Sequence, residues 1–391
     1  MRIPPGSSDI RICWLLPTAW FYWQPSLSEL AKVFLSVKVF TGLFPGFAQG
    51  LEGSIDVEVV GTRKVFAITK SQMSYGNNFT SLSPQIILRL FKYKPDVILS
   101  SSFGIWSILA LLFKYLGGWK VIIAYEGSSP GVDYRNSVTR LLLRRLMVFF
   151  ADACITNSHI GKDYLINYLN ATESTVFVQP YEVPDLRSFE DDNNFSQTIS
   201  NSELSFNNFK RPVFIFVGSL VPRKGVRCLV EACSHLKKAG NHSFSILILG
   251  DGPQRQELEA LSHEYDLDNQ MIWTGRIDYA DIARYFHYSD IFVLPTLEDT
   301  WGMVVLEAML LGKPILCSDG AGASELIEEG KNGYRFEAGN SEELAAMMKK
   351  FIDNPEKIDD MGKASKRIMD KYTPVAAAEM MSKVIRYVTG T

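Results

Sequence analysis

Two carboxylates, Asp299 and Glu307, stand eight residues apart where a strand pattern gives way to a helical pattern (IFVLPTLEDTWGMVVLEAML). On a helix this spacing is about 12 Å of rise and roughly 80° of rotation, so both can line one face and hold the ends of an extended ligand. The amides of Gly302, Met303 and Val304 lie between them and can hold a diphosphate. Glu307 interrupts an apolar face, where a pair of ribose hydroxyls would satisfy a buried carboxylate. The plainer alternative is a capping Asp299 with an exposed or salt-bridged Glu307.

Two other strand-to-helix junctions contain glycines. In VFIFVGSLVPRKGVRCLVEAC, the cations Arg223 and Lys224 precede Gly225 at an expected helix start. A helix start with nearby cations is an anion site, and an ordinary turn with exposed cations is an equal alternative. In ILILGDGPQRQELEAL, the GDGP turn has neither the GxGxxG nor the Walker pattern, so we expect it to be architectural.

Short apolar runs alternate with helical patterns along the chain. Most runs are continuous rather than alternating, as in parallel strands buried on both faces, which predicts an α/β fold. The expected strands are Ile10–Leu16, Val57–Val60, Asp96–Ser100, Val121–Tyr125, Ala153–Asn157, Val176–Gln179, Val213–Val217, Ser245–Leu249, Met271–Thr274, Ile291–Leu294 and Pro314–Ser318.

Composition limits the function classes. The chain has 391 residues, 47% of them hydrophobic and 21% charged, which excludes wholesale disorder. A net charge of −3 argues against nucleic acid as the main partner. A polar stretch rich in Asn, Ser and Asp at about 188–210 predicts a linker between two domains.

The cysteines and the N-terminus bear on the compartment. The five cysteines are scattered and lack zinc-site spacing, so we expect buried, reduced thiols and no metal site. The N-terminus has no long apolar region, so we expect no signal peptide. The expected location is therefore the cytoplasm. The segment Arg140–Phe150 mixes basic and apolar residues at helical spacing, either as a membrane-surface helix or as a core helix with a solvated basic edge.

Five pieces from Pro212 to Glu343 together resemble the retaining GT-B glycosyltransferases of family 4 (group 1): VGSLVPRKG, GDGP, WTGRI, DTWGMVVLEAM and CSDGAGASELIEEGKNGYRF. The resemblance implies two Rossmann-like domains whose parallel sheets face each other across a cleft. Residues 1–205 would form the acceptor-side domain and 206–372 the nucleotide-sugar-binding domain. A C-terminal helix over 373–391 would pack back on the first domain.

The resemblance also implies roles for residues of the second half. The diphosphate of the donor would be held by Ser219, Arg223, Lys224, Gly302, Met303 and Val304. The donor sugar would be held by Asp299, Thr300, Trp301 and Gly302. Glu307 would bind the ribose, and the backbone of Arg276 and Ile277 would meet the nucleobase.

Two positions depart from the family. Ser219 stands where the family usually has an arginine, and Arg223 can supply the charge instead. The family commonly offers a histidine after the strand Val121–Tyr125, where this chain has Glu126. A carboxylate there can orient a hydroxyl or accept a proton, or it can cap a helix or pair with Arg135.

The resemblance leads us to expect a retaining hexosyltransferase that moves a sugar from a nucleotide diphosphate sugar to a hydroxyl acceptor. Lys224, Asp299 and Glu126 are the expected catalytic residues, and no metal cofactor is expected, because protein cations offset the charge of the leaving group. A non-catalytic nucleotide-sugar-binding protein and a nucleotide-sugar epimerase on the same scaffold are the alternatives.

The acceptor has a weaker signal, in the aromatic loop after the first strand. Trp20 and Trp23 can stack on a sugar ring or rest at a membrane interface, and core packing is an equal alternative. With the basic segment at 140–145, they lead us to expect a saccharide or lipid-linked saccharide acceptor. We expect it at the inner face of the membrane, in polysaccharide or glycoconjugate synthesis.

Overall fold

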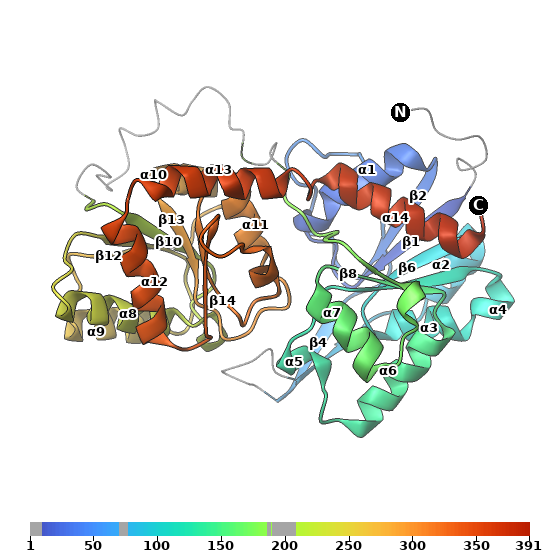
Figure 1. Ribbon diagram of the computed structural model, residues 1–391. Helices are drawn as coiled ribbons and strands as arrows, with labels where there is room; N and C mark the ends of the chain where they lie inside the picture. The colour runs from blue at the N-terminus through green and yellow to red at the C-terminus, as the bar shows by residue number, and fades with distance from the viewer. Residues whose placement is uncertain (1–9, 70–76, 186–188, 190–208) are drawn as a thin grey trace. The chain divides into compact units, whose positions relative to one another are not determined.

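The computed structural model describes residues 10–69, 77–185, 189 and 209–391 (Figure 1). These residues form two compact units. The first holds the described residues up to Asp185 together with Tyr372–Thr391, and the second holds those from Phe189 to Lys371. The linker expected at about 188–210 lies almost wholly outside the described residues, as does the expected boundary at 205.

The first unit is built on a parallel seven-stranded sheet in the order β3-β2-β1-β6-β7-β8-β9. Its central strands are buried on both faces, which explains their continuous apolar sequences. The strand order reverses between β1 and β6, the usual place for a ligand in such sheets. The strands are β1 (Arg11–Leu16), β2 (Ser36–Thr41), β3 (Asp56–Val59), β6 (Val97–Ser101), β7 (Lys120–Tyr125), β8 (Ala153–Thr156) and β9 (Val176–Val178), with a separate antiparallel hairpin of β4 (Lys64–Thr69) and β5 (Asn77–Ser81).

Helices from both ends of the chain belong to this unit. The last helix, α14, lies along α1 (Figure 1). Thr373 caps α14 by accepting a hydrogen bond from the amide of Ala376 at 3.1 Å, and Pro374 occupies the first turn. The helices are α1 (Gln24–Val33), α2 (Ile86–Tyr93), α3 (Ile105–Leu112), α4 (Lys114–Gly117), α5 (Pro130–Asp133), α6 (Val138–Phe150), α7 (His159–Asp163) and α14 (Pro374–Thr389).

The second unit contains a parallel six-stranded sheet in the order β12-β11-β10-β13-β14-β15. Here the order reverses between β10 and β13, so the loops after these two strands become neighbours. Its strands are β10 (Val213–Val217), β11 (Ser245–Leu249), β12 (Met271–Gly275), β13 (Ile291–Leu294), β14 (Ile315–Ser318) and β15 (Gly333–Phe336). Its helices are α8 (Val226–Lys238), α9 (Arg255–Glu264), α10 (Ile282–Tyr288), α11 (Met303–Leu310), α12 (Ser341–Asp353) and α13 (Lys357–Met369).

The strands expected from the sequence are all present, each within one residue of its expected bounds. The parallel α/β class is therefore confirmed. The expected burial of the cysteines is also confirmed, since all five are buried and unbonded to one another. Across the described ranges, no helix has the length and apolar character needed to span a membrane.

Candidate functional site

The loops that follow β10 and β13 interlock through their backbones. The carbonyl of Arg223 accepts hydrogen bonds from the amide of Leu297 at 2.7 Å and from Oγ1 of Thr296 at 2.9 Å. Gly225 has a left-handed φ of 66°, and a Cβ there would lie 1.9 Å from the carbonyl oxygen of Pro295. Only glycine fits this crossing, so the sequence RKG fixes how closely the two loops approach.

Lys224 and Asp299, expected to serve one site, form an ion pair through Nζ and Oδ2. Their side chains are only 14% and 10% exposed, so the pair is poorly screened by water. The backbone of Asp299 is fixed as well, because its amide donates to the carbonyl of Gly320 at 2.8 Å and its carbonyl accepts from Gly322 at 3.1 Å. The structure thus places a cation and a carboxylate at the reversal point of the sheet.

Arg223 is anchored to the same loop. Its Nη1 donates to the backbone carbonyl of Glu298 at 3.2 Å. The carboxylate-bearing residue Glu298 is itself buried, at 5% exposed. The expectation that Arg223 supplements the charge of Lys224 stays a prediction. The hydrogen bond to Glu298 holds the Arg223 guanidinium at the loop that carries Asp299.

The helix expected near Trp301 or Gly302 begins at Met303. Gly302 precedes it with a φ of 98°, a conformation that favours glycine, and Trp301 is buried beside it. The loop residue Thr300 is packed tightly, since a Cβ on Gly322 would lie 2.4 Å from its carbonyl oxygen. The first turn of α11, which carries the amides of Met303 and Val304, therefore begins shortly after Asp299 in the chain.

Glu307 is buried in the middle of α11, at 6% exposed. Its Oε1 accepts a hydrogen bond of 2.9 Å from the hydroxyl of Tyr279. Burial raises the pKa of Glu307 to about 7, and the hydrogen bond from Tyr279 opposes that rise. The alternative of an exposed Glu307 is wrong.

Tyr279 was not singled out from the sequence. It lies in the short turn Tyr279–Asp281, 28 residues before Glu307, and its ring packs on Phe189 with centroids 5.7 Å apart. The signal available in the sequence was the position of Glu307 on an apolar face, which requires a polar partner without saying which.

A cavity of about 730 Å³ opens at the carboxyl ends of β10 and β11. Ser219, Arg276 and Ile277 line it, so the structure brings together three residues expected to serve the donor. Gly250 and Gly252 also line it, and a Cβ on Gly250 would lie 1.8 Å from the carbonyl of Gly218. The GDGP turn, expected to be only architectural, therefore forms a wall of this cavity.

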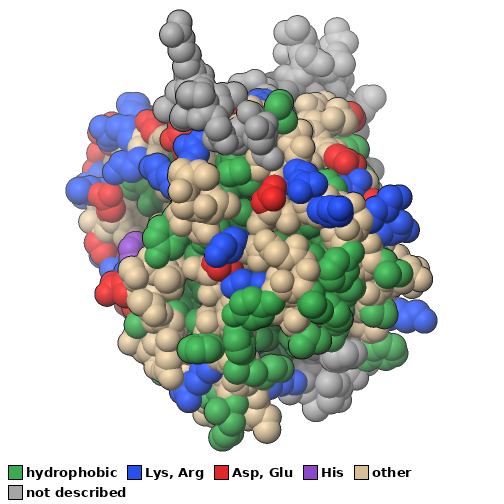
Figure 2. Space-filling view, turned by 90° about the vertical axis from the view of Figure 1, so that its right-hand side faces the viewer, with side chains coloured by type: hydrophobic (Ala, Val, Ile, Leu, Met, Phe, Trp, Pro, Cys, Tyr) green, Lys and Arg blue, Asp and Glu red, His purple; other side chains and the backbone are tan. Residues whose placement is uncertain are grey.

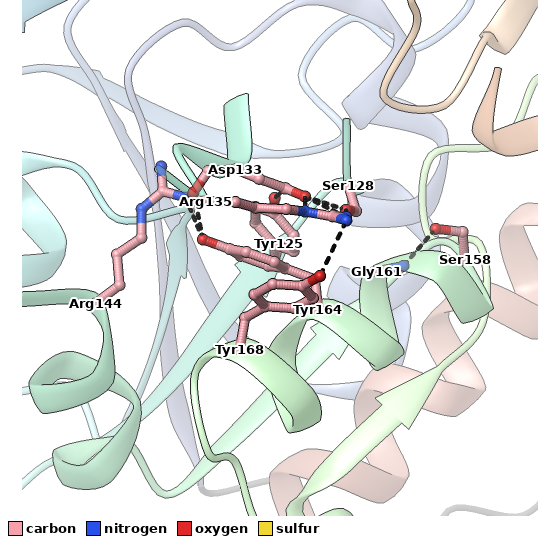
Figure 3. Close-up of polar contacts among 9 residues, drawn as sticks. All are labelled: Tyr125, Ser128, Asp133, Arg135, Arg144, Ser158, Gly161, Tyr164 and Tyr168. Carbon is pink, nitrogen blue, oxygen red and sulfur yellow. Dashed lines mark hydrogen bonds and ion pairs between the residues drawn. The ribbon is translucent and has the colours of Figure 1, made fainter. Parts of the chain in front are cut away.

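In the first unit, Glu126 directly follows β7. The residues after it contribute to a cluster of hydrogen-bonded polar side chains around Asp133 (Figure 3). Asp133 is fully buried and accepts hydrogen bonds from Tyr125 at 2.5 Å, Ser128 at 2.5 Å and Nε of Arg135 at 2.8 Å. Burial and the neighbouring carboxylate raise the pKa of Tyr125 well above its usual value. Arg135, offered from the sequence as a partner for Glu126, pairs with Asp133.

Two tyrosines extend this cluster (Figure 3). The hydroxyl of Tyr164 donates to the carbonyl of Asp133 at 2.6 Å and accepts from Arg144 at 2.8 Å. The guanidinium of Arg135 lies over the ring of Tyr168, 4.6 Å from its centroid. The segment 126–135 is thus held at the carboxyl end of β7, the edge at which doubly wound sheets bind ligands.

The two tryptophans expected near an acceptor differ in exposure. Trp20 is 40% exposed, while Trp23 is 2% exposed. The ring of Trp23 packs against Trp14 at 5.1 Å and Tyr181 at 5.3 Å. Trp23 therefore packs in the core, and of the two only Trp20 presents a surface to solvent.

Comparison with known proteins supports the resemblance. Residues 200–368 match the family model of the glycosyl transferases group 1. Sulfoquinovosyl transferase SQD2 of Arabidopsis thaliana is 27% identical over 301 residues, 75% of this chain and 56% of that protein. Alpha-D-kanosaminyltransferase of Streptomyces kanamyceticus is 29% identical over 177 residues, 45% of this chain and 46% of that protein. The chain thus spans about half the length of these relatives.

Solved structures extend the similarity over the whole chain. HepE of Anabaena in complex with UDP superposes with a TM-score of 0.76 at 19% identity, over 97% of this chain and 100% of that one. Sucrose-phosphate synthase of Thermosynechococcus elongatus gives a TM-score of 0.71 at 17% identity, over 97% and 99%. The expected GT-B fold of two Rossmann-like units is confirmed.

Proposed function

Because residues 200–368 match the family model of the glycosyl transferases group 1, we propose that the chain transfers a sugar from a nucleotide diphosphate sugar to a hydroxyl acceptor with retention at the anomeric carbon. The observation that carries this proposal is the buried Lys224–Asp299 pair at the sheet reversal, followed directly by the first turn of α11. Cation, carboxylate and amides there suit a sugar diphosphate.

The leaving group sets the chemistry of the site. As the bond between the anomeric carbon and the β-phosphate oxygen breaks, negative charge develops on the diphosphate. Lys224 and the amides of Met303 and Val304 stabilise that charge, so the proposed reaction needs no metal cofactor. Asp299 holds the donor sugar with Thr300, Trp301 and Gly302. Glu126 is the proposed carboxylate for the acceptor hydroxyl, and it takes the hydroxyl proton as the new bond to the anomeric carbon forms.

The nucleoside is assigned to the other end of the site. Glu307 accepts hydrogen bonds from the two ribose hydroxyls, and the base enters the cavity lined by Ser219, Arg276 and Ile277. HepE, which shares the fold, is described in complex with UDP. A hexosyl donor and a saccharide or lipid-linked saccharide acceptor, used in the cytoplasm in polysaccharide or glycoconjugate synthesis, complete the proposal.

The test is thermal stabilisation by UDP, GDP and ADP in the presence of EDTA. A nucleotide at 100 times its dissociation constant adds about 2.7 kcal/mol to the free energy of unfolding. We expect one nucleotide to raise the melting temperature of the wild type and of Glu264→Ala, an exposed carboxylate of α9. Glu307→Ala should lose the shift. A full shift in Glu307→Ala, or none in the wild type, contradicts the proposed donor site.

Ser219 favours one alternative, a protein that binds nucleotide sugars without turning them over. A neutral side chain lines the cavity where the family resemblance implies a cation. Chromatography of the donor separates the possibilities. Transfer consumes donor only when acceptor is present, an epimerase converts donor alone, and a sensor leaves it intact.

A further inference from the structure

An apolar surface lies exposed on the first unit, over α3, α4 and α6. Figure 2 shows apolar side chains gathered on this face, with Lys and Arg side chains beside them. We call it the α4–α6 surface and define it by six side chains that are 54–79% exposed: Leu112, Tyr115, Leu116, Leu142, Leu146 and Phe149. Exposed apolar patches of this kind mark interaction sites.

The α6 helix is apolar on the side where a surface helix is normally polar. Leu142, Leu146 and Phe149 follow one another at intervals of four and three residues, so they form one stripe. Met147 and Val148 are buried and attach the other side of the helix to the core. The helix therefore has an apolar face for the core and a second apolar face for something outside it.

A groove of about 260 Å³ runs through this surface between α3–α4 and α6. Its lining is apolar apart from the hydroxyl of Tyr115 and includes Ile108, Leu111, Leu143 and Met147. A groove with such walls suits a hydrocarbon segment better than a polar one.

The charge around the surface has one sign. The sequences of α3, α4 and α6 contain no Asp or Glu, while α6 contributes Arg140, Arg144 and Arg145. The guanidinium of Arg140 lies 3.7 Å from the centroid of the Tyr134 ring, and Nε of Arg145 donates to the carbonyl of Tyr168 at 2.8 Å. Helical spacing places Arg145 next to the apolar stripe, whereas Arg140 and Arg144 point away from it, toward the Tyr134 ring and the carbonyl of Asp133.

The carboxylate of Asp152, two residues after the end of α6, is already offset. It pairs with Lys114 at 2.7 Å and with Lys120 at 3.4 Å. The three helices also contain no Asn or Gln, whereas a protein interface makes about one hydrogen bond per 100–200 Å². Apolar side chains beside cations, with few hydrogen-bonding groups, match a lipid surface better than a protein partner.

We propose that the α4–α6 surface docks this chain on an anionic lipid bilayer. Leu142, Leu146 and Phe149 enter the boundary between head groups and acyl chains, and Arg145 beside them faces the lipid phosphates. The proposal does not depend on the transfer reaction, because the surface is built from the first unit alone.

Flotation of the full chain with vesicles tests it. We expect co-flotation with phosphatidylglycerol–phosphatidylcholine vesicles at low salt, and less with phosphatidylcholine alone or at high salt. The double variant Leu142→Glu/Phe149→Glu should stay at the bottom. Its matched control, Leu35→Glu/Val375→Glu, adds the same charge at exposed apolar positions outside the surface and should float. Arg145→Gln should weaken partitioning about fivefold.

Three outcomes overturn the proposal. The first would be a wild type that does not float with anionic vesicles, and the second a Leu142→Glu/Phe149→Glu variant that floats as the wild type does. The third would be a dimer, seen by light scattering with or without lipid, that this variant dissociates. The last result would make the surface an interface between two copies. A thermal shift by nucleotide that survives in Leu142→Glu/Phe149→Glu keeps this test separate from the test of the donor site.

Discussion

Glu307→Gln is expected to make the protein more stable and worse at binding nucleotide. The ordinary pKa of a glutamate is 4.5, and burial raises that of Glu307 to about 7. The folded chain therefore holds a proton that the unfolded chain has lost between these two values. The contribution of Glu307 to stability is greatest below pH 4.5 and falls as the pH rises through 7. The loss is about 3 kcal/mol, since one unit of pKa corresponds to about 1.4 kcal/mol.

Glutamine has the shape of the protonated acid and does not titrate. Its side-chain oxygen can still accept the hydrogen bond from Tyr279. The variant should match the wild type near pH 5 and exceed it by about 3 kcal/mol at pH 8. At about 2–4 °C per kcal/mol, that is roughly 6–12 °C in melting temperature. Glu264→Gln, an exposed position, should show no such dependence on pH.

Nucleotide binding should move in the opposite direction. Two ribose hydroxyls lose an ionised acceptor, and a hydrogen bond to a charged group contributes about 1.5–3 kcal/mol. The affinity at pH 8 should fall by one to two orders of magnitude, measured by calorimetry. A melting-temperature difference that does not grow from pH 5 to pH 8 would refute the burial argument. Unchanged affinity would refute the ribose assignment.

Three other changes test the local packing. Lys224→Met should abolish diphosphate binding and cost about 3 kcal/mol of stability, because Asp299 stays buried without its cation. Adding Asp299→Asn should restore stability but not binding. Urea unfolding and calorimetry measure the two effects. Gly225→Ala should destabilise the protein by more than about 2 kcal/mol, because the new Cβ meets the carbonyl of Pro295. The control Gly240→Ala, at a left-handed residue in open space, should cost about 1 kcal/mol. Equal melting temperatures of the two variants would contradict the contact with Pro295. Asp133→Asn should cost about 3 kcal/mol, because the fully buried carboxylate loses the charge that three donors surround. Tyr125→Phe should cost about 1–2 kcal/mol, and the reverse order in thermal melts would contradict the central place of Asp133.

The sequence predicts the strands well because most are buried on both faces, which leaves an uninterrupted apolar run. The strands it misses are of another kind. β2 (SVKVFT) includes Lys38, which pairs with Asp56 and Glu58, and β15 (GYRF) has only four residues. Such strands owe their place to the neighbours they pair with rather than to their own pattern.

The same division holds for the site. Glu307 and Lys224 stand out because a carboxylate in an apolar helix and a cation beside a glycine turn are local features. Their partners are not local, since Asp299 is 75 residues from Lys224 and Tyr279 is 28 residues from Glu307. Asp133 gives no signal in PGVDY, although its donors Tyr125, Ser128 and Arg135 lie within eight residues of it, because the irregular turn that directs them at one buried carboxylate has no periodic pattern.

Three glycines line the cavity at the ends of β10 and β11. Gly218, Gly250 and Gly252 bring carbonyls and amides to its surface, and a methyl group on Gly250 would collide with the carbonyl of Gly218. A library of side-chain substitutions at these positions would lose folded protein before it changed which base enters. Redesign of the preferred nucleotide would instead have to alter the length of the loops after β11 and β12.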